Sequence, residues 1–485
     1  MKLHNCLKNE QKNFCLTISK NRENLLQFKD EMMSRGGKME NIKKTCVKYP
    51  YLEKPIEIYE RECGHKIVYA YKKGALINIS SWVKTGSINE NDENNGISHF
   101  LEHLMFKGTS KHKAGFFDRT LESKGAIVNA ATWKDYTFYY VTLPKGVDES
   151  NFNTTLELHA DMMLDPVIPP EEIGEPFDLN VPVKTKRERH VVIEEIRMRK
   201  DQPWTKVYNM VNNNLYTQHP YKRDVIGNEQ IISQISRETI LNYYKKYYSP
   251  NNITTIIVGD LNPDDVIPKI AKAFDFKGRE NISPVEYQTD IQPIGGKYCE
   301  DYSEISTGFM MFGYLGAKAC DIKSTVTIEM ICSVLGDGLS SRLYQELIEK
   351  EPEQIFNSIG AYYYTFKDSG NIFVQANFKP DKKEIAIDKI KDQIIKMYTD
   401  GISEQELNKV KKKLKAYFAA NSETVSDIAD TIGEYMTVYG NLEFVEEYVE
   451  TIDKITLEDI KSVAMKYLNV DNSVISVLLP SEFKN

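Results

Sequence analysis

Histidine is rare in this chain, yet two of its eight histidines lie four residues apart in SHFLEHLMF, residues 98–106. His99 and His103 flank Glu102, and residues three and four positions apart share one face of a helix. Apolar residues on the remaining sides predict that this helix is buried. Buried imidazoles and carboxylates are costly unless they are paired or bind a metal. The H-x-x-E-H spacing therefore predicts a zinc site, although a packed helix that matches by chance is the alternative.

A catalytic zinc ion needs a third protein ligand and one open position. The best downstream candidate is KRERHVVIEEIRMRKDQP, residues 186–203, whose apolar positions predict a helix with one buried side. Glu188 and Glu195 are two helical turns apart on one face, whereas Glu194 points about 100° away from Glu195. A charged helix of this type is commonly a solvated face. The residues alone leave Glu188, Glu194 and Glu195 as alternatives.

Length and composition indicate a multidomain globular protein. A chain of 485 residues predicts two to four domains, and 41% hydrophobic with 27% charged residues is typical of soluble proteins. The net charge of −8 argues against nucleic acid as a partner. No apolar run is long enough to predict a membrane span.

The seven cysteines are scattered and form no C-x-x-C pair, so we expect neither a disulfide framework nor a cysteine zinc site. This usage fits a reducing compartment. The N-terminus lacks the apolar core of a secretory signal, and its acidic residues argue against a mitochondrial presequence. We therefore expect a cytoplasmic location of bacterial type, with the mitochondrial matrix as the weaker alternative.

An internal duplication predicts the fold. ETILNYYKKYYSPNNITTIIVGDL, residues 238–261, and EDIKSVAMKYLNVDNSVISVLLP, residues 458–480, each predict an amphipathic helix, a turn and a β-branched strand. Earlier segments of the two halves also correspond, but TIEMICSVL takes the place of the histidine helix in the second half. We predict an α+β fold of two homologous domains, each an antiparallel-rich sheet with helices packed on one face.

The same comparison places the domain boundaries. Residues 1–45 are expected to be a flexible N-terminal extension, and residues 46–275 the zinc-bearing domain. A stretch with Pro and Gly but no periodicity, residues 276–298, is expected to be the linker. Residues 299–485 are expected to form the homologous domain without a metal site.

The chain resembles the pitrilysin/insulinase peptidases, also called inverzincins. Within that family it resembles the short two-domain branch of the mitochondrial processing peptidase and its bacterial relatives. The matching stretches are HFLEHLMFKGT, GAIVNAATWKDYTFYY, ERHVVIEEI, HPYKRDVIG and PNNITTIIVGDL, in the family's order. The resemblance implies a zinc metalloendopeptidase with one Zn²⁺ per chain, bound by His99, His103 and Glu195. It also implies that Glu188 supports the ligands, and that Glu102 acts as general base and then as acid.

The resemblance further implies how substrate binds. Asn129 and Ala130 lie in the family's edge strand, to which an extended peptide adds as a further β-strand, so short or unfolded polypeptides are the expected substrates. Phe106 matches a family residue that lines the pocket just after the cut. An ordinary hairpin strand and plain core packing are the alternatives for these residues. The segment IPPEEIGEPFDLNVPVKTK is longer than usual for the family and is expected to be a surface excursion.

Two departures from the family bear on substrate and partner. The processing peptidase has acidic residues that bind a substrate arginine, and their equivalents here are Thr205 and Asn209, which weakens presequence cleavage as the function. Active homodimers have an arginine and a tyrosine in the second domain, where this chain has Ile348 and Asn357.

We therefore expect a dimer, preferably a heterodimer with a related subunit that supplies the arginine and tyrosine. A tyrosine of this chain is the alternative donor: Tyr362, Tyr363 or Tyr364. A non-catalytic core or interaction subunit of the same fold is the alternative function.

Overall fold

The computed structural model describes residues 42–146, 149–180, 185–288 and 296–484. The N-terminal segment before residue 42 lies outside the described residues, so most of the predicted extension is untested. Its end needs a correction, because Lys43, Lys44 and Thr45 pair with Glu60, Tyr59 and Ile58 as part of a strand. In the described ranges, no helix has both the length and the apolarity to cross a membrane.

The first half is built on a seven-stranded sheet, sheet 1. All neighbouring strands are antiparallel except the parallel pair β3–β7. In spatial order the strands are β1 (Lys43–Val47), β2 (Ile56–Glu60), β3 (Lys66–Tyr71), β7 (Ile253–Gly259), β4 (Leu76–Val83), β6 (Thr137–Pro144) and β5 (Ile127–Thr132).

The second half is built on a five-stranded sheet, sheet 2, in which only β12 and β8 are parallel. In spatial order its strands are β10 (Phe356–Thr365), β11 (Gly370–Phe378), β9 (Gly308–Gly316), β12 (Val474–Pro480) and β8 (Lys297–Ser303). Read from the opposite edge, β8-β12-β9-β11-β10 repeats the order β3-β7-β4-β6-β5 of sheet 1. The duplication and the α+β class predicted from the sequence are thereby confirmed.

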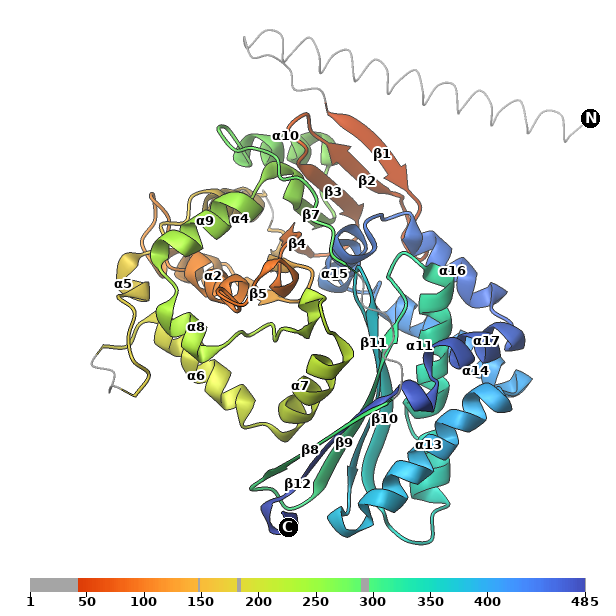
Figure 1. Cartoon of the computed structure of the whole chain (residues 1–485). Helices are drawn as coiled ribbons and strands as arrows, with labels where there is room; N and C mark the ends of the chain where they lie inside the picture. The colour runs from red at the N-terminus through yellow and green to blue at the C-terminus, as the bar shows by residue number, and fades with distance from the viewer. Residues whose placement is uncertain (1–41, 147–148, 181–184, 289–295, 485) are drawn as a thin grey trace, which may run out of the picture.

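Both halves contain helices as well as strands, and the two kinds of element alternate in groups along the chain (Figure 1). The first half contains α2 (Ile97–Met105), α3 (Phe116–Glu122), α4 (Ser150–Leu164), α5 (Pro170–Ile173), α6 (Glu188–Lys200), α7 (Pro203–Leu215), α8 (Glu229–Gln234), α9 (Arg237–Tyr247) and α10 (Pro263–Ala273). The second half contains α11 (Ile322–Gly336), α12 (Arg342–Tyr344), α13 (Lys383–Thr399), α14 (Glu404–Ala420), α15 (Val425–Glu434), α16 (Phe444–Lys454) and α17 (Leu457–Tyr467). Two π-helical segments, Gln345–Glu349 and Tyr435–Tyr439, extend α12 and α15.

Short 3-10 turns complete the described structure. They are Ser87–Asn89, Pro220–Lys222, Pro250–Asn252, Pro380–Lys382, Val470–Asn472 and Ser481–Phe483.

At the central strand β7 both faces of sheet 1 are buried, which explains why β7 is a nearly continuous run of β-branched residues rather than an alternating one. Alternate residues of β7 belong to different cores. Ile257 packs with the helices of the first half, whereas Ile256 and Val258 join the hydrophobic core of the second half. The helices of the first half therefore cover one face only, as predicted.

The other face of each sheet is covered by a helix from the opposite half. Helix α15 packs on β4 and β7 of sheet 1, and α7 packs on β9 and β12 of sheet 2. Glycines allow both approaches. A Cβ atom on Gly433 of α15 would lie 1.9 Å from the Trp82 ring, and one on Gly313 of β9 would lie 2.2 Å from Val211 of α7. Each half thus completes the core of the other.

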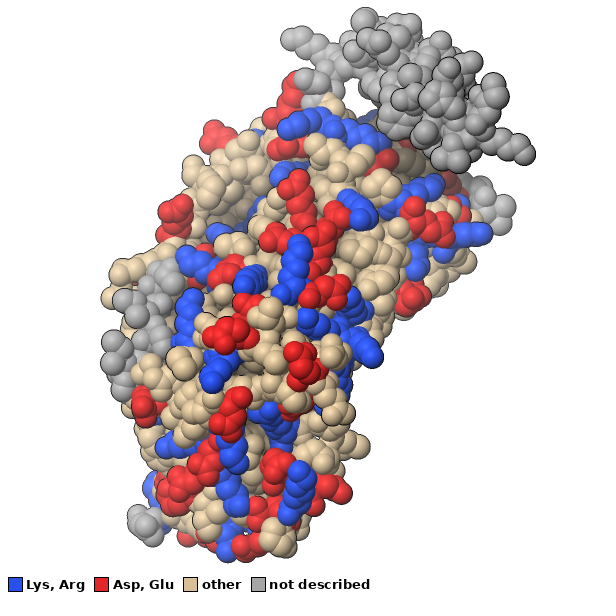
Figure 2. Space-filling view, turned by 90° about the vertical axis from the view of Figure 1, so that its right-hand side faces the viewer, with Lys and Arg blue, Asp and Glu red and all other residues tan. Residues whose placement is uncertain are grey.

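The charged surface agrees with the composition. On the face that carries the helices of the second half, basic and acidic side chains are interspersed, with no broad area of one sign (Figure 2). This pattern is typical of an ordinary solvated surface and gives no electrostatic footprint for a polyanion on this face.

Candidate metal centre

The helix that carries both histidines is anchored at its start. The left-handed residue Gly96 precedes it, with φ 98°, and a Cβ atom there would lie 2.8 Å from the Gly227 backbone. The carboxylate of Glu90 accepts hydrogen bonds from the backbone N–H groups of Gly96 and Ser98, at 2.7 and 2.9 Å. Glu90 thereby satisfies N–H groups that a helix start leaves without partners. This cap fixes where α2 begins and hence where its side chains point.

Three potential ligands converge between α2 and α6. The Nε2 atoms of His99 and His103 both lie 3.6 Å from the same oxygen, Oε2 of Glu195. All three ligand atoms lie within 4.8 Å of one another, and no other such group of His, Cys, Asp or Glu occurs in the residues that the structure describes. Glu194 points away, exposed and paired with Arg197 at 3.2 Å. The geometry thus brings to the histidines Glu195, the residue that the family resemblance implied, and not Glu194.

This donor set fits a zinc ion. Two imidazole nitrogens and one carboxylate oxygen are ligands of catalytic zinc sites. A tetrahedral ion with bonds of about 2.0–2.1 Å needs donors roughly 3.3 Å apart, close to the observed 3.6 Å. At 3.6 Å the same atoms are too far apart for hydrogen bonds. The atoms are therefore spaced for a shared cation rather than for direct contact.

Glu188 supports the histidines from the first turn of α6. Its Oε1 lies 2.8 Å from His103 Nδ1, and its Oε2 lies 2.5 Å from the ammonium of Lys107. Its own backbone N–H donates to the carboxylate of Glu172, at 3.0 Å. Glu172 belongs to the predicted surface excursion, part of which, residues 181–184, lies outside the described residues. The excursion therefore contacts the first turn of α6, the helix that carries Glu188 and Glu195.

The two histidines differ in electrostatic environment. Burial lowers the pKa of His99 to about 4, and the neighbouring His103 adds to this effect. Burial also opposes charge on His103, but the carboxylates of Glu188 and Glu195 outweigh it and raise its pKa to about 9. In return, His103 holds the pKa of Glu195 below its usual value. The Nδ1 atom of His99 is buried and has no hydrogen-bond partner among the described residues.

Glu102 stands beside the ligands and is held by a residue that the sequence did not single out. Its Oε2 accepts a 2.5 Å hydrogen bond from the hydroxyl of Thr132, the last residue of β5. Burial raises the pKa of Glu102, and the bond from Thr132 opposes that rise in part. Thr132 lies inside the stretch VNAATWKDY, but its partner lies thirty residues earlier, so spacing alone could not identify the contact.

An open cleft runs from Glu102 along β5. It has a volume of about 550 Å³, and its lining includes Glu102, His103, Phe106, Asn129 and Ala130. β5 is the last strand of sheet 1 and pairs only with β6, so its outer edge has no strand beside it in the described structure. Each predicted substrate-binding residue thus lies in the cleft. Asn129 is exposed, and the ring of Phe106 also packs 6.1 Å from that of Tyr139.

A second cavity, of about 250 Å³, lies between α7, sheet 2 and the turn after β5. Thr205 and Asn209 line it, as does a carboxylate that the sequence argument missed, Asp224. The amide of Asn209 donates to Asp224 at 3.0 Å. Among the tyrosines considered as donors, Tyr364 lines this cavity, whereas the hydroxyl of Tyr363 donates to the backbone of Ala317.

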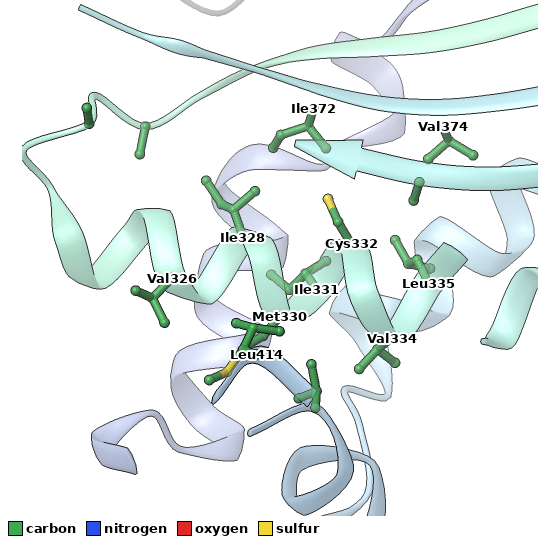
Figure 3. Close-up of a cluster of buried hydrophobic side chains, with 14 of the residues drawn as sticks. Val326, Ile328, Met330, Ile331, Cys332, Val334, Leu335, Ile372, Val374 and Leu414 are labelled. Atoms are coloured by element: carbon green, nitrogen blue, oxygen red, sulfur yellow. The ribbon is translucent and has the colours of Figure 1, made fainter. Parts of the chain in front are cut away.

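In residues 296–484, the described part of the second half, no group of His, Cys, Asp or Glu is arranged as a metal centre. Helix α11, the counterpart of α2, presents apolar side chains both to β11 and to α14 (Figure 3). Ile328, Cys332 and Leu335 occupy its buried surface. Ile348 packs against the core of this half, and the amide of Asn357 is bonded to Asn377 at 2.6 Å. Ile348 has no hydrogen-bond donor in its side chain, and the amide of Asn357 is engaged within the second half.

Comparison with known proteins agrees with this geometry. Residues 66–229 match the family described as Insulinase (Peptidase family M16), and residues 234–414 match the one described as Peptidase M16 inactive domain. An uncharacterized zinc protease of Rickettsia felis is 27% identical over 399 residues, which cover 82% of this chain and 90% of the relative. Zinc protease PqqE of Helicobacter pylori is 28% identical over 413 residues, which cover 84% of this chain and 88% of that protein.

Solved structures show the same two-domain arrangement. A protease from Helicobacter pylori superposes with a TM-score of 0.78 at 26% identity. The match covers 90% of this chain and 100% of the chain of that protease. A structure titled as a peptidase M16 inactive domain, from Pseudomonas fluorescens, has a TM-score of 0.76 at 19% identity, with coverage of 91% and 98%, and so supports the fold alone. With both halves matched in order, and the histidine helix in the half that matches the insulinase description, the chain belongs to the pitrilysin/insulinase family of peptidases, in its short two-domain form.

Proposed function

We propose that this chain is a zinc-dependent endopeptidase, a catalytic subunit that hydrolyses short or unfolded polypeptides. The observation that carries the proposal is the convergence of His99, His103 and Glu195 beside an open cleft. Glu102, from the same helix as the histidines, lines that cleft. A non-catalytic subunit would have no need to keep all four groups in this arrangement. The names of the curated relatives support zinc and proteolysis for the family.

In this proposal His99, His103 and Glu195 hold one zinc ion, and Glu188 orients the ring of His103. When bound, zinc supplies Lewis acidity, which polarises a carbonyl and acidifies water. Glu102 takes the proton of the attacking water and later delivers it to the leaving amine. Thr132 keeps the carboxylate of Glu102 turned toward the ligands.

The free edge of β5 binds the substrate. An extended peptide continues sheet 1 by main-chain hydrogen bonds beside Asn129 and Ala130, and Phe106 packs against one of its side chains. Backbone pairing of this kind requires an unfolded segment and reads side chains only through flanking pockets. The absence of acidic residues at Thr205 and Asn209 argues against a strong demand for arginine, and hence against presequence processing.

The assembly proposed with this activity is a heterodimer. Oxyanion stabilisation contributes strongly to peptidase rates, and losing one donor typically costs about 10²–10³ in rate. Ile348 has no donor to give, and Asn357 is a short, neutral substitute whose amide is bonded to Asn377. A related subunit that keeps the arginine and tyrosine would supply them to the centre between α2 and α6.

A direct test combines metal and turnover. The purified chain should bind one zinc ion per molecule, measured by elemental analysis, and should cleave a quenched unstructured peptide. Glu102→Gln should keep zinc and lose cleavage, because the carboxylate moves the proton but does not bind the ion. Chelation should abolish cleavage, and added zinc should restore it.

The outcome separates the two functions. Zinc bound without cleavage, even after addition of a related subunit, would favour the non-catalytic role. Full activity of the isolated chain would remove the need for a partner and direct attention to Tyr364, the one of the three candidate tyrosines that lines the second cavity.

A further inference from the structure

We propose that the second cavity is a specificity pocket for a large apolar or aromatic side chain of the substrate. This inference rests on the proposed peptidase function and adds a selectivity to it. The cavity measures about 250 Å³, or roughly eight water volumes at about 30 Å³ each, which is the scale of one large side chain.

The walls of the pocket are aromatic rings from both halves of the chain. Trp133 faces Tyr364 with ring centroids 6.4 Å apart, and both Tyr364 and Tyr208 pack against Phe373, at 5.9 and 5.6 Å. Trp204 completes the wall from the start of α7. Trp133 and Tyr364 remain 37% and 44% exposed, so the chain itself does not fill the space between them. A substrate ring would cover these surfaces and displace water from them.

The charges around the pocket disfavour a basic side chain. Lys134 is buried and donates to two backbone carbonyls at 2.6 and 3.0 Å, and burial lowers its pKa to about 8. Arg199 is exposed and, after His103, contributes to the lowered pKa of the Glu195 carboxyl. Asp224, the single acid of the lining, is already engaged by Asn209. Two of the three charged side chains in the lining are thus cationic, so a lysine or arginine of the substrate would find a single carboxylate there, shared with those cations.

The pocket lies on the path that a substrate strand must follow. The first cleft runs beside residues 126–130, Thr132 ends β5 next to Glu102, and the second cavity begins at Trp133 and Lys134. A peptide paired along β5 therefore passes the first cleft, then Glu102, then the second cavity. The two cavities take side chains on opposite sides of the bond that is cut, and the aromatic pocket reads one fixed position.

The experiment uses the zinc-loaded full chain and three quenched peptides that differ at one position. Profiling a peptide library by mass spectrometry first identifies the position nearest the cut with the strongest preference. Peptides with Phe, Ala or Arg there are then compared. We expect kcat/KM for Phe to exceed that for Ala at least about tenfold, the scale of apolar pocket discrimination, with Arg no better than Ala.

Variants assign the preference to the pocket. Tyr364→Ala should reduce the Phe-over-Ala ratio severalfold, whereas Tyr364→Phe, which keeps the ring, should retain it. Tyr362→Ala is the matched control, because Tyr362 has the same exposure on the same strand, 45%, but does not line the cavity. Thr205→Trp, which fills the cavity, should shift the preference toward Ala.

The inference stays testable if no peptide is cut. Binding of the same peptides to Glu102→Gln, measured by fluorescence anisotropy, reports the preference without turnover, so absence of cleavage would count against the proposed function alone. Equal affinity and equal kcat/KM for Phe and Ala would overturn the pocket assignment. A preference for Arg or for an acidic residue, or a loss of the ratio in Tyr362→Ala as large as in Tyr364→Ala, would overturn it as well.

Discussion

The hydroxyl of Thr132 donates a 2.5 Å hydrogen bond to the carboxylate of Glu102, and this bond ties the end of the edge strand to the histidine helix. The strand proposed to bind the peptide and the carboxylate proposed to move the proton are therefore in direct contact. Pairing of a substrate along β5 would fix Thr132 and, through it, the orientation of Glu102.

Thr132→Val should lower kcat by about 10–100-fold while zinc content and KM change little, because proton transfer depends on how the carboxylate is aimed. Thr132→Ser, which keeps a hydroxyl, should recover most of the loss. Steady-state kinetics with zinc analysis measures both. A rise in KM at unchanged kcat would assign Thr132 to substrate binding instead.

Glu195→Gln should remove most of the zinc, whereas Glu194→Gln should keep it. Only the carboxylate of Glu195 lies near both imidazoles, and that of Glu194 is exposed and paired with Arg197. The two variants change neighbouring residues in the same way, so each controls for the other. Elemental analysis after dialysis decides, and zinc loss in Glu194→Gln alone would reverse the ligand assignment.

Glu188→Gln should weaken zinc binding by about 10–100-fold without abolishing it, the usual effect of removing a group that orients a metal-binding histidine. The reason is its 2.8 Å contact with His103 Nδ1. Competition with a chromophoric chelator gives the affinity. An affinity equal to that of the unaltered chain would mean that the carboxylate of Glu188 is not needed to orient the ring of His103.

Glu434→Gln should stabilise the protein at pH 8 more than at pH 5. Burial, with help from Asp430, raises the pKa of Glu434 from 4.5 to about 7. Between these values the folded chain holds a proton that the unfolded chain has released, so stability falls as pH rises and the full penalty applies above about pH 7. Glutamine has no charge to bury, so the gain should be about 1–3 kcal/mol at pH 8, allowing for partial exposure.

Urea unfolding at the two pH values measures this difference. Most of the gain should vanish at pH 5, where the Glu434 carboxyl of the folded unaltered chain is neutral, as the glutamine amide of the variant is. An equal effect at the two pH values would mean that packing, and not ionisation, distinguishes the variant.

Much of the metal centre could be predicted because its parts are local. The spacing of His99, Glu102 and His103 on one helix, and the two-turn spacing of Glu188 and Glu195 on another, are set by helix geometry alone. The choice of Glu195 over Glu194 needed the family resemblance in addition. The duplication predicted that the two halves share a fold, and the matching strand orders of the two sheets agree with it, but the order itself was not predicted.

Contacts between distant segments could not be predicted. Thr132 reaches Glu102 only because β5 and α2 pack together, and the aromatic pocket combines Trp133 of the first half with Tyr364 of the second. The cover of each sheet by a helix of the other half leaves a signal, the unbroken apolar run of β7, but that run does not name the helix that buries it.

The packing of α15 on sheet 1 has a consequence for how the protein is made. The strand of sheet 1 that comes last in the sequence, β7, ends at Gly259, and α15 begins at Val425. At about 5–20 residues per second, the ribosome needs on the order of 10–30 s to reach the helix that covers Trp82. During that time the nascent first half has a finished set of strands but an open apolar face. Release of that half alone, by truncation or early termination, should give an aggregating product, and the two halves gain by being translated as one chain.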